Sequence, residues 1–337
     1  MELDTLTNLT EERLKVKISR QDKSVESLAD DVVAGLSANP KTLPPKYFYD
    51  KVGSRIFEEI CDLPEYYPTR TELAILENYA DDIARQFDEP IRLIELGSGN
   101  SFKTRVLIEA FLRRFETLHY MPIDISKSIL VKTANDLLEQ YPNLKITAYV
   151  SDYHTALHAL KNQEMGGKLI LFLGSNIGNF EPEQALNFLK KTFATMNDDD
   201  RLLMGVDLMK DETILKPAYD DAEGVTAKFN QNLLVRLNRE LDGDFDLSKF
   251  RHKIVFNGEH GRIELHLEST ENQTVSLSKI DQQFEFEQGE TIHTENSYKY
   301  SPEKLTALAE SGGFELKTSW FDGNKWFSLN LLRPIDD

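Results

Sequence analysis

Between residues 91 and 208 the sequence alternates short apolar segments with amphipathic ones, and this alternation restricts the fold more than any other feature. The apolar segments have the length of strands and the segments between them have helical periodicity. The five expected strands are 91–96, 119–124, 144–152, 167–176 and 201–208. Strands that are apolar on both sides are typical of a parallel sheet whose two faces are covered by helices. The region therefore predicts an α/β fold.

The rest of the chain predicts a C-terminal hairpin and a second domain. Residues 314–333 read as two strands around an Asp-Gly-Asn turn, an antiparallel hairpin at the edge of the parallel sheet. A polar helix over 218–241, followed by several strands, predicts an α+β insertion. We expect a loose arm over 1–25, a sheet domain over 71–207 and 300–337, and a smaller α+β domain over 26–70 and 208–299.

Charge and composition exclude several classes of partner. The net charge of −18 argues against a nucleic-acid groove or an anionic membrane surface. Cys61 is the only cysteine, which excludes an internal disulfide and a cysteine zinc cluster, and His154 with His158 lacks a third zinc ligand. No apolar run approaches the roughly 18 residues of a membrane span. We expect a cytoplasmic monomer that acts on a small molecule and needs no metal.

The segment ELGSGNSFKT, residues 95–104, joins the first expected strand to its helix through two glycines. Gly97 and Gly99 begin the GxGxxG pattern of dinucleotide-binding proteins, but Phe102 stands where the third glycine is required. Phe102 also interrupts the phosphate loop that Gly97 could begin and Lys103 could complete. A diphosphate therefore fits poorly, whereas a single carboxylate near Lys103 and the helix N-terminus fits better.

Polar residues follow the next two strands, at the edge where open parallel sheets bind ligands. Asp124 ends the second strand, and its carboxylate can accept both hydroxyls of a ribose. Asp152 and Tyr153 end the third strand, where a polar edge and an aromatic face suit an adenine. An adenosine that carries a carboxylate in place of phosphates is S-adenosylmethionine. A nicotinamide-dependent dehydrogenase would also explain Gly97 and Asp124, but it would explain neither Phe102 nor the lack of a histidine for hydride transfer.

From Lys46 to nearly the C-terminus, the chain resembles the histidine-specific Nα-methyltransferases of ergothioneine biosynthesis. The segments that carry the resemblance are LPPKYFYD (43–50), LPEYYPTRTE (63–72), ELGSGNSFKT (95–104), FLGSNIGNF (172–180), the long run 218–247 and ENSYKY (295–300). The resemblance implies a class I, Rossmann-like methyltransferase domain and a substrate-binding domain formed by the N-terminal helices and the insertion. It also implies successive methylation of the α-amine of L-histidine by S-adenosylmethionine, which yields the trimethylated betaine hercynine.

The resemblance further implies which residues contact each ligand. For the methyl donor they are Gly97, Lys103, Asp124, Asp152 and Tyr153. For the amino acid they are Tyr66, Asn179, Tyr219, Glu295 and Ser297, and we add Tyr49, Gly174 and Leu265 to this set. Tyr49 and Asn179 are the candidates for a catalytic role, and the base that removes the proton of the amine stays unassigned.

Glu295 and Ser297 carry the expectation for the side chain of the substrate. Because they are two residues apart on an expected strand, they point the same way, and an acceptor beside a hydroxyl suits the two nitrogens of an imidazole. A solvated strand face that includes His293 and Lys299 is the alternative. Leu265 stands where the histidine enzymes of the family carry methionine, which leaves open the same chemistry on another amino acid such as tryptophan. A non-catalytic sensor of amino acids or adenosine is the alternative from another class.

Overall fold

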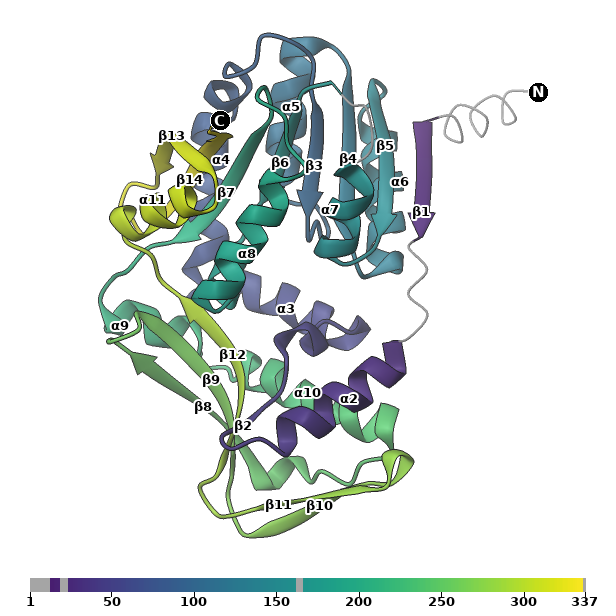
Figure 1. The fold of residues 1–337 in the computed structure, drawn as a ribbon, viewed down its shortest axis with the longest axis vertical. Coiled ribbons are helices and arrows are strands. Elements are labelled where there is room, and N and C mark those ends of the chain that lie inside the picture. The colour runs from purple at the N-terminus through teal and green to yellow at the C-terminus, as the bar shows by residue number, and fades with distance from the viewer. Residues whose placement is uncertain (1–12, 19–23, 162–165, 336–337) are drawn as a thin grey trace, which may run out of the picture. The chain divides into compact units, whose positions relative to one another are not determined.

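The structure is a computed structural model, and it describes residues 13–18, 24–161 and 166–335 (Figure 1). The described chain divides into two compact units. The first comprises residues 13–18, 68–161, 166–208 and 300–335, and the second comprises residues 24–67 and 209–299. The sequence predicts a change of domain after residues 70, 207 and 299, and the units change after residues 67, 208 and 299.

The first unit is built on an eight-stranded, mostly parallel sheet (Figure 1). Its strands lie in the order β1-β5-β4-β3-β6-β7-β14-β13. Their bounds are β1 Leu14–Ile18, β3 Arg92–Leu96, β4 Leu118–Asp124, β5 Leu144–Val150, β6 Lys168–Phe172, β7 Arg201–Asp207, β13 Phe314–Phe321 and β14 Phe327–Pro334. The first six strands in this order pair in parallel, whereas β14 is antiparallel to β7 and to β13. The predicted parallel sheet with a C-terminal antiparallel hairpin is confirmed.

Helices cover both faces of this sheet, and each face has its own hydrophobic core. One face is covered by α4 (Tyr67–Ala84), α5 (Thr104–Phe115) and α6 (Lys127–Gln140), and the other by α7 (Tyr153–Lys161), α8 (Pro182–Phe193) and α11 (Pro302–Ser311). In β3, Leu93 belongs to the first core, while Ile94 and Leu96 belong to the second. Both sides of a central strand are therefore apolar, which produces the continuous apolar segments in the sequence.

Residues 14–18 form an edge strand, so the prediction of a loose arm is wrong for this part of the N-terminal region. β1 pairs in parallel with β5 along its whole length. The Arg13 guanidinium donates to the carbonyls of Leu138 and Tyr141, at 3.0 Å each, near the end of α6. Because the side chains of β1 are largely exposed, pairing with a distant strand fixes it, and the local pattern does not reveal it. Residues 1–12 and 19–23 lie outside the described residues.

The second unit is an α+β assembly around the long helix α10 (Val225–Leu241) (Figure 1). Its other elements are α2 Ser24–Leu36, β2 Lys41–Thr42, the 3-10 helix η1 Pro45–Phe48, α3 Lys51–Asp62, α9 Glu212–Leu215, η3 Lys216–Ala218, η4 Leu247–Lys249, β8 Phe250–Asn257, β9 Arg262–Ser269, β10 Gln273–Leu277, η5 Ser278–Ile280, β11 Gln282–Phe286 and β12 Thr291–Tyr298. One sheet has the order β2-β12-β9-β8, and β10 pairs with β11. Phe229 and Leu233 of α10 join Phe48 and Leu267 in a single core.

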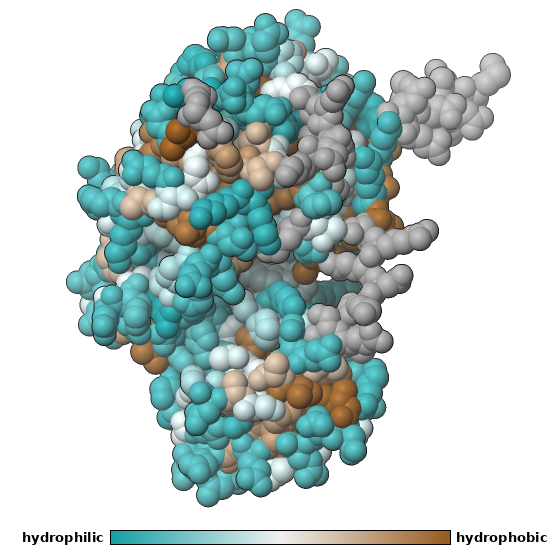
Figure 2. Space-filling view, viewed as in Figure 1, coloured by the Kyte–Doolittle hydropathy of each residue, from teal (hydrophilic) through white to brown (hydrophobic). Residues whose placement is uncertain are grey.

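The face of the molecule drawn in Figure 2 is mainly polar. Figure 2 shows a face on which hydrophilic residues predominate and hydrophobic ones form small areas. Among the exposed large apolar side chains are Phe102 and Ile125, which follow β3 and β4 at the carboxyl edge of the parallel sheet. Within the described ranges, no helix is long and apolar enough to cross a membrane.

Candidate active site

The turn between β3 and α5 lies against residues that follow β4 and β5. Gly97 has a φ of 73°, a conformation that favours glycine, and a Cβ at this position would lie 2.7 Å from the Tyr153 hydroxyl. The N–H of Gly99 donates to Asp124 Oδ2 at 2.9 Å. The structure therefore brings together Gly97, Asp124 and Tyr153, which come from three different strand ends.

Asp124 is oriented by the backbone on both sides of its carboxylate. Besides the bond from Gly99, Oδ1 accepts from the N–H of Ser126 at 2.8 Å. Burial raises the pKa of the Asp124 carboxyl, and the backbone donors oppose this rise. Each carboxylate oxygen has a second lone pair, so the group can accept two ribose hydroxyls as well. The exposed side chain of Ile125 beside it offers an apolar surface for a planar base.

Asp152 and Tyr153 stand at the start of α7. Asp152 caps this helix, because its Oδ1 accepts from the Thr155 N–H at 2.9 Å and its Oδ2 from the Thr155 hydroxyl at 2.8 Å. The ring of Tyr153 packs edge to face on Phe172, with the centroids 5.6 Å apart. Burial, with a contribution from Asp124, raises the pKa of Tyr153, so its hydroxyl stays protonated at neutral pH.

Glu95, at the end of β3, supports the glycine turn from inside the core. Its carboxylate accepts from the Thr104 hydroxyl at 2.5 Å and from the Tyr120 hydroxyl. The hydroxyl of Ser101 lies 2.8 Å from that of Tyr120. Burial raises the pKa of Glu95 to about 7, although both donors lower it. Glu95 thus ties the start of α5 and the middle of β4 to the turn, which makes it a positioning residue.

Two buried hydroxyls beside these strand ends have no hydrogen-bond partner in the described part of the chain, those of Ser98 and Ser151. Ser98 stands between the two glycines of the turn, and Ser151 directly precedes Asp152. Buried polar atoms are nearly always paired in folded proteins, so an unpaired one needs an explanation such as a ligand. Both hydroxyls fit a polar ligand such as adenosine that lies along the ends of β3, β4 and β5.

Glu72 of α4, which the sequence does not mark as a site residue, is fully buried beside the same edge of the sheet. Its carboxylate accepts from the Lys103 ammonium and from the N–H of Gly174, which lies 2.8 Å from Oε1 and 3.0 Å from Oε2. The only hint in the sequence is that Glu72 ends the segment LPEYYPTRTE. Helical spacing alone does not separate it from the other acidic residues of α4.

Gly174 and Asn179 follow β6 within the first unit. Gly174 has a φ of 73°, and Ser175 after it is also left-handed, so the chain turns sharply where β6 ends. The Ser175 hydroxyl accepts from the N–H of Asp207 at 2.9 Å, which fixes this turn to β7. Asn179 ends the 3-10 helix η2 (Asn176–Asn179) and is half-buried. Both predicted amino-acid contacts thus stand at the carboxyl end of β6.

Three tyrosines predicted to contact the amino acid form one aromatic cluster in the second unit. The rings of Tyr49 and Tyr66 each pack edge to face on Phe57, with centroid distances of 5.6 and 6.2 Å. Tyr66 also contacts Tyr219 edge to face at 6.5 Å. Burial raises the pKa of Tyr66 well above its usual value, and Tyr219, Cys61, Tyr49 and Glu295 add to this effect. Tyr66 is therefore a neutral hydroxyl and not a base at neutral pH.

The Tyr219 hydroxyl belongs to a compact polar group with Ser297 and Lys299. Its oxygen lies 2.7 Å from Ser297 Oγ, and the Lys299 ammonium donates to both oxygens at 2.7 Å. Lys299 is 3% exposed, so this face of β12 is not the solvated face of the alternative interpretation. The sequence contains the signal, because Glu295 and Ser297 of β12 and Lys299 directly after it occupy alternate positions.

Glu295 is buried on the same strand, directly opposite Leu265 of β9. Burial raises the pKa of Glu295 to about 7, and the charge of Lys299 opposes the rise. Leu265 is also buried. An ionisable carboxyl and an apolar side chain thus line one face of this sheet side by side.

His252 of β8 holds the backbone of Tyr219 in place. Its Nε2 lies 2.8 Å from the Tyr219 carbonyl oxygen and its Nδ1 lies 2.9 Å from the side-chain nitrogen of Asn230. Thr294 in turn donates to Asn230 Oδ1 at 2.9 Å. Burial lowers the pKa of His252, which keeps the ring neutral so that Nε2 can donate while Nδ1 accepts. These supporting residues come from three distant segments, and no local pattern predicts their contact.

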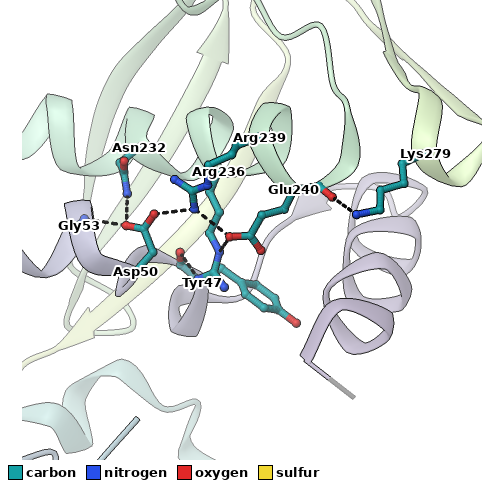
Figure 3. A network of polar contacts seen from close by, with 8 residues as sticks. All are labelled: Tyr47, Asp50, Gly53, Asn232, Arg236, Arg239, Glu240 and Lys279. Carbon is teal, nitrogen blue, oxygen red and sulfur yellow. Dashed lines mark hydrogen bonds and ion pairs between the residues drawn. The ribbon is translucent and has the colours of Figure 1, made fainter. Parts of the chain in front are cut away.

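A second network fixes the segment that carries Tyr49 (Figure 3). Asp50 caps α3 by accepting from the N–H of Gly53 at 2.7 Å, and its carboxylate also accepts from Asn232 at 3.0 Å and Arg239 at 2.8 Å, both on α10. Arg236, one turn earlier on α10, donates to the carbonyl of Tyr47 at 3.0 Å. Figure 3 shows these side chains pointing from α10 toward the loop before α3. Residues on both sides of Tyr49 are thereby held.

The order of strands in the first unit, with a glycine turn after its central strand and an antiparallel hairpin at one edge, is that of the class I S-adenosylmethionine-dependent methyltransferases. A family model described as "Histidine-specific methyltransferase, SAM-dependent" matches residues 28–334. The chain belongs to this family. The predicted resemblance is thus confirmed, as are the enzyme class and S-adenosylmethionine as methyl donor.

Several relatives are similar over most of this chain. A protein named histidine N-alpha-methyltransferase from Mycolicibacterium smegmatis is 42% identical over 92% of this chain and 96% of its own. One of the same name from Mycobacterium tuberculosis is 40% identical over 90% and 94%. Ergothioneine biosynthesis protein 1 of Schizosaccharomyces pombe is 31% identical over 82% of this chain and 37% of its own.

Proposed function

We propose that the protein transfers methyl groups from S-adenosylmethionine to the α-amine of L-histidine in three successive steps, giving hercynine, the first step of ergothioneine biosynthesis. The observation that carries this proposal is the buried carboxyl of Glu295 on the same strand as Ser297, whose hydroxyl is hydrogen-bonded with Tyr219 and Lys299, in a chain of this family. Such a group suits a small zwitterion that also carries a polar ring.

The first unit is proposed to hold the methyl donor. Asp124 would accept from the ribose hydroxyls, Gly97 would let the backbone approach the ligand, and Asp152 with Tyr153 would border the adenine. Lys103, at the start of α5, would bind the carboxylate of the donor. The unpaired hydroxyls of Ser98 and Ser151 support this assignment, because adenosine offers them both donors and acceptors.

The roles at the amino acid follow from the kinds of atoms present. Glu295 would accept from one imidazole nitrogen, and Ser297 would bond the other. An ammonium has no acceptor, so the oxygens of Tyr219 and Ser297 both accept from Lys299, and Tyr219 would donate to the carboxylate of the substrate. Tyr49, Tyr66, Gly174 and Asn179 are proposed to contact the amine and the carboxylate, and Leu265 is proposed to limit the size of the ring.

Little acid–base chemistry is required of these residues. When bound, S-adenosylmethionine supplies an electrophilic methyl group on a sulfonium, so the protein's task is to hold a neutral amine in line with it. An α-amine with a pKa of about 8 is partly neutral at physiological pH. Because the pKa of Tyr66 is raised, its hydroxyl stays protonated at neutral pH and does not take the proton of the amine. In the described ranges no group of three or more His, Cys, Asp and Glu side chains could hold a metal ion.

Mass spectrometry tests the proposal directly. With isotope-labelled S-adenosylmethionine, histidine should gain one, two and then three labelled methyl groups, and exhaustive chelation should not reduce the rate. Calorimetry with S-adenosylhomocysteine, NADH and histidine separates the alternatives, because a dehydrogenase would bind NADH and a sensor would bind without turnover. Methylation of tryptophan in preference to histidine would show the same chemistry on another amino acid.

We also propose that the enzyme works as a cytoplasmic monomer without a nucleic-acid partner, as the sequence predicts. The high negative charge supports the lack of a nucleic-acid partner. Light scattering after size exclusion tests the monomer, with a mass near 38.7 kDa as the expected result. Fractionation of cells tests the location.

A further inference from the structure

Glu72 and Lys103 form a buried ion pair at the edge of the sheet where the donor is proposed to bind. The side chain of Glu72 is completely buried, while that of Lys103 is 22% exposed. Glu72 stands on α4 and Lys103 at the start of α5, so two separate elements contribute to the pair. A buried carboxylate is costly unless it is paired and hydrogen-bonded, so the position of Glu72 needs a reason.

The carboxylate of Glu72 is held rigidly. Both of its oxygens accept from the N–H of Gly174, at 2.8 and 3.0 Å. Gly205 of β7 lies so close that any Cβ there would collide with Glu72 Oε1. Lys103 is the partner that can move, because it is the more exposed of the two and its ammonium is at the end of a flexible four-carbon stem. A cation that replaces Lys103 on Glu72 would therefore meet a preformed acceptor.

We propose that this ion pair is the receptor for the zwitterionic amino-acid end of the methyl donor, with Glu72 accepting from its α-ammonium group and Lys103 bonding its carboxylate. The α-ammonium takes the position on Glu72 that Lys103 holds, and the ammonium of Lys103 turns to the carboxylate of the ligand. Two charges of each sign then alternate, so no net charge is added to a buried site. The inference rests on the assignment of the donor and adds the residue that recognises its ammonium group.

A purely structural role for Glu72 predicts something different. If Glu72 served only to anchor Gly174 and Lys103, its loss would loosen the end of β6 and weaken the binding of every ligand of the site alike. A receptor for the ammonium group affects only ligands that carry this group. S-adenosylhomocysteine has the amino-acid end, and 5′-methylthioadenosine keeps the adenosine and the sulfur but lacks that end, so the two compounds separate the roles.

The experiment is calorimetric titration of wild type and Glu72→Gln with both compounds. We expect Glu72→Gln to lower the affinity for S-adenosylhomocysteine by roughly 10- to 100-fold, the range for hydrogen bonds to charged groups. The affinity for 5′-methylthioadenosine should change by less than about threefold. Glu315→Gln is the matched control. It removes the same charge from a partly exposed pair with Arg333 in the same unit, and it should leave both affinities unchanged.

Each other outcome counts against the inference. Equal affinity of Glu72→Gln and wild type for S-adenosylhomocysteine overturns the proposal. An equal loss of affinity for both compounds would show that Glu72 has a structural role only. If Glu72→Gln does not fold, wild type is titrated with the deaminated analogue of S-adenosylhomocysteine, which should bind at least about tenfold more weakly; equal binding overturns the proposal. If wild type binds neither adenosine compound, the proposed donor site itself is wrong, and this result differs from one that contradicts only the role of Glu72.

Discussion

Glu295 of β12 and Leu265 of β9 are directly opposite each other in an antiparallel pair, and both side chains are buried. One face of the sheet thus places an ionisable carboxyl, proposed to recognise a ring nitrogen, next to an apolar side chain that is proposed to limit the size of the ring. The carboxyl is followed at alternate positions by Ser297 on β12 and by Lys299 directly after the end of this strand. The residues proposed to select the substrate are thus concentrated in a short segment.

The pKa of Glu295 predicts a pH dependence for histidine binding. Burial raises this pKa to about 7, against the charge of Lys299. Only the ionised carboxylate is a full acceptor for an imidazole N–H, so binding should weaken as the pH falls through 7. We expect KM for histidine to rise about tenfold between pH 8 and pH 6 in wild type. Glu295→Gln serves as the control, because it keeps the titration of histidine itself but should lose this additional limb.

The same shift makes a prediction about stability. A carboxyl with a raised pKa binds its proton more tightly in the folded than in the unfolded protein, so stability is lost as the pH rises through about 7. Glu295→Gln should therefore be more stable than wild type at pH 8, and the difference should shrink toward pH 5. Chemical denaturation at the two pH values measures this. A variant that is destabilised equally at both would show that Glu295 stabilises the fold as an ion.

Lys299 is predicted to act on the substrate site and not on the donor site. Lys299→Met removes the donor to the Tyr219 and Ser297 oxygens and removes the charge that lowers the pKa of Glu295. KM for histidine should increase by at least about tenfold, and the acid limb of the pH profile should move to higher pH. Affinity for S-adenosylhomocysteine should not change. Lys317→Met, which removes an exposed lysine, is the matched control and should resemble wild type.

Asp124 is predicted to anchor the donor. Asp124→Ala leaves the N–H groups of Gly99 and Ser126 without their acceptor and removes the proposed contact with the ribose. Binding of S-adenosylhomocysteine should weaken by roughly 1–3 kcal/mol in calorimetry. Asp152→Ala, which removes the cap of α7, should cost about 1 kcal/mol of unfolding free energy in addition to any loss of affinity. Unchanged affinity in Asp124→Ala would mean that β4 does not end at the ribose.

The architecture of the first unit follows from local patterns, because β3 to β7 are buried on both faces and therefore apolar throughout. The roles of the supporting residues cannot be predicted from local patterns, because they arise from contacts between segments that are distant in the sequence. Glu72 is one acidic residue among several on α4 until Gly174 and Lys103 approach it. His252 gains its role only because β8 lies beside the carbonyl of Tyr219. β1 lacks a buried face, so its pairing with β5 cannot be predicted from alternation alone.

The last prediction concerns selectivity and rests on Glu295 and Leu265. If the carboxylate of Glu295 accepts a hydrogen bond from the imidazole, an aromatic amino acid without matching ring nitrogens leaves this desolvated carboxylate unpaired. Sites built on such polar contacts can reject the wrong ligand by roughly 10⁴-fold, far more than an apolar pocket achieves. Glu295→Ala should therefore lower kcat/KM for histidine by at least about 100-fold, while activity on tryptophan or phenylalanine stays level or rises.

Because Leu265 lies directly opposite on β9, Glu295→Ala combined with Leu265→Val should favour a bulkier ring further. The measurement is a competition assay with equimolar histidine, tryptophan and phenylalanine on wild type and both variants, with the donor affinity determined in parallel. The donor affinity should stay constant, because Glu295 belongs to the second unit and Asp124 to the first. If activity on histidine and on tryptophan falls together in Glu295→Ala, then Glu295 supports the fold of β12 and does not recognise the ring.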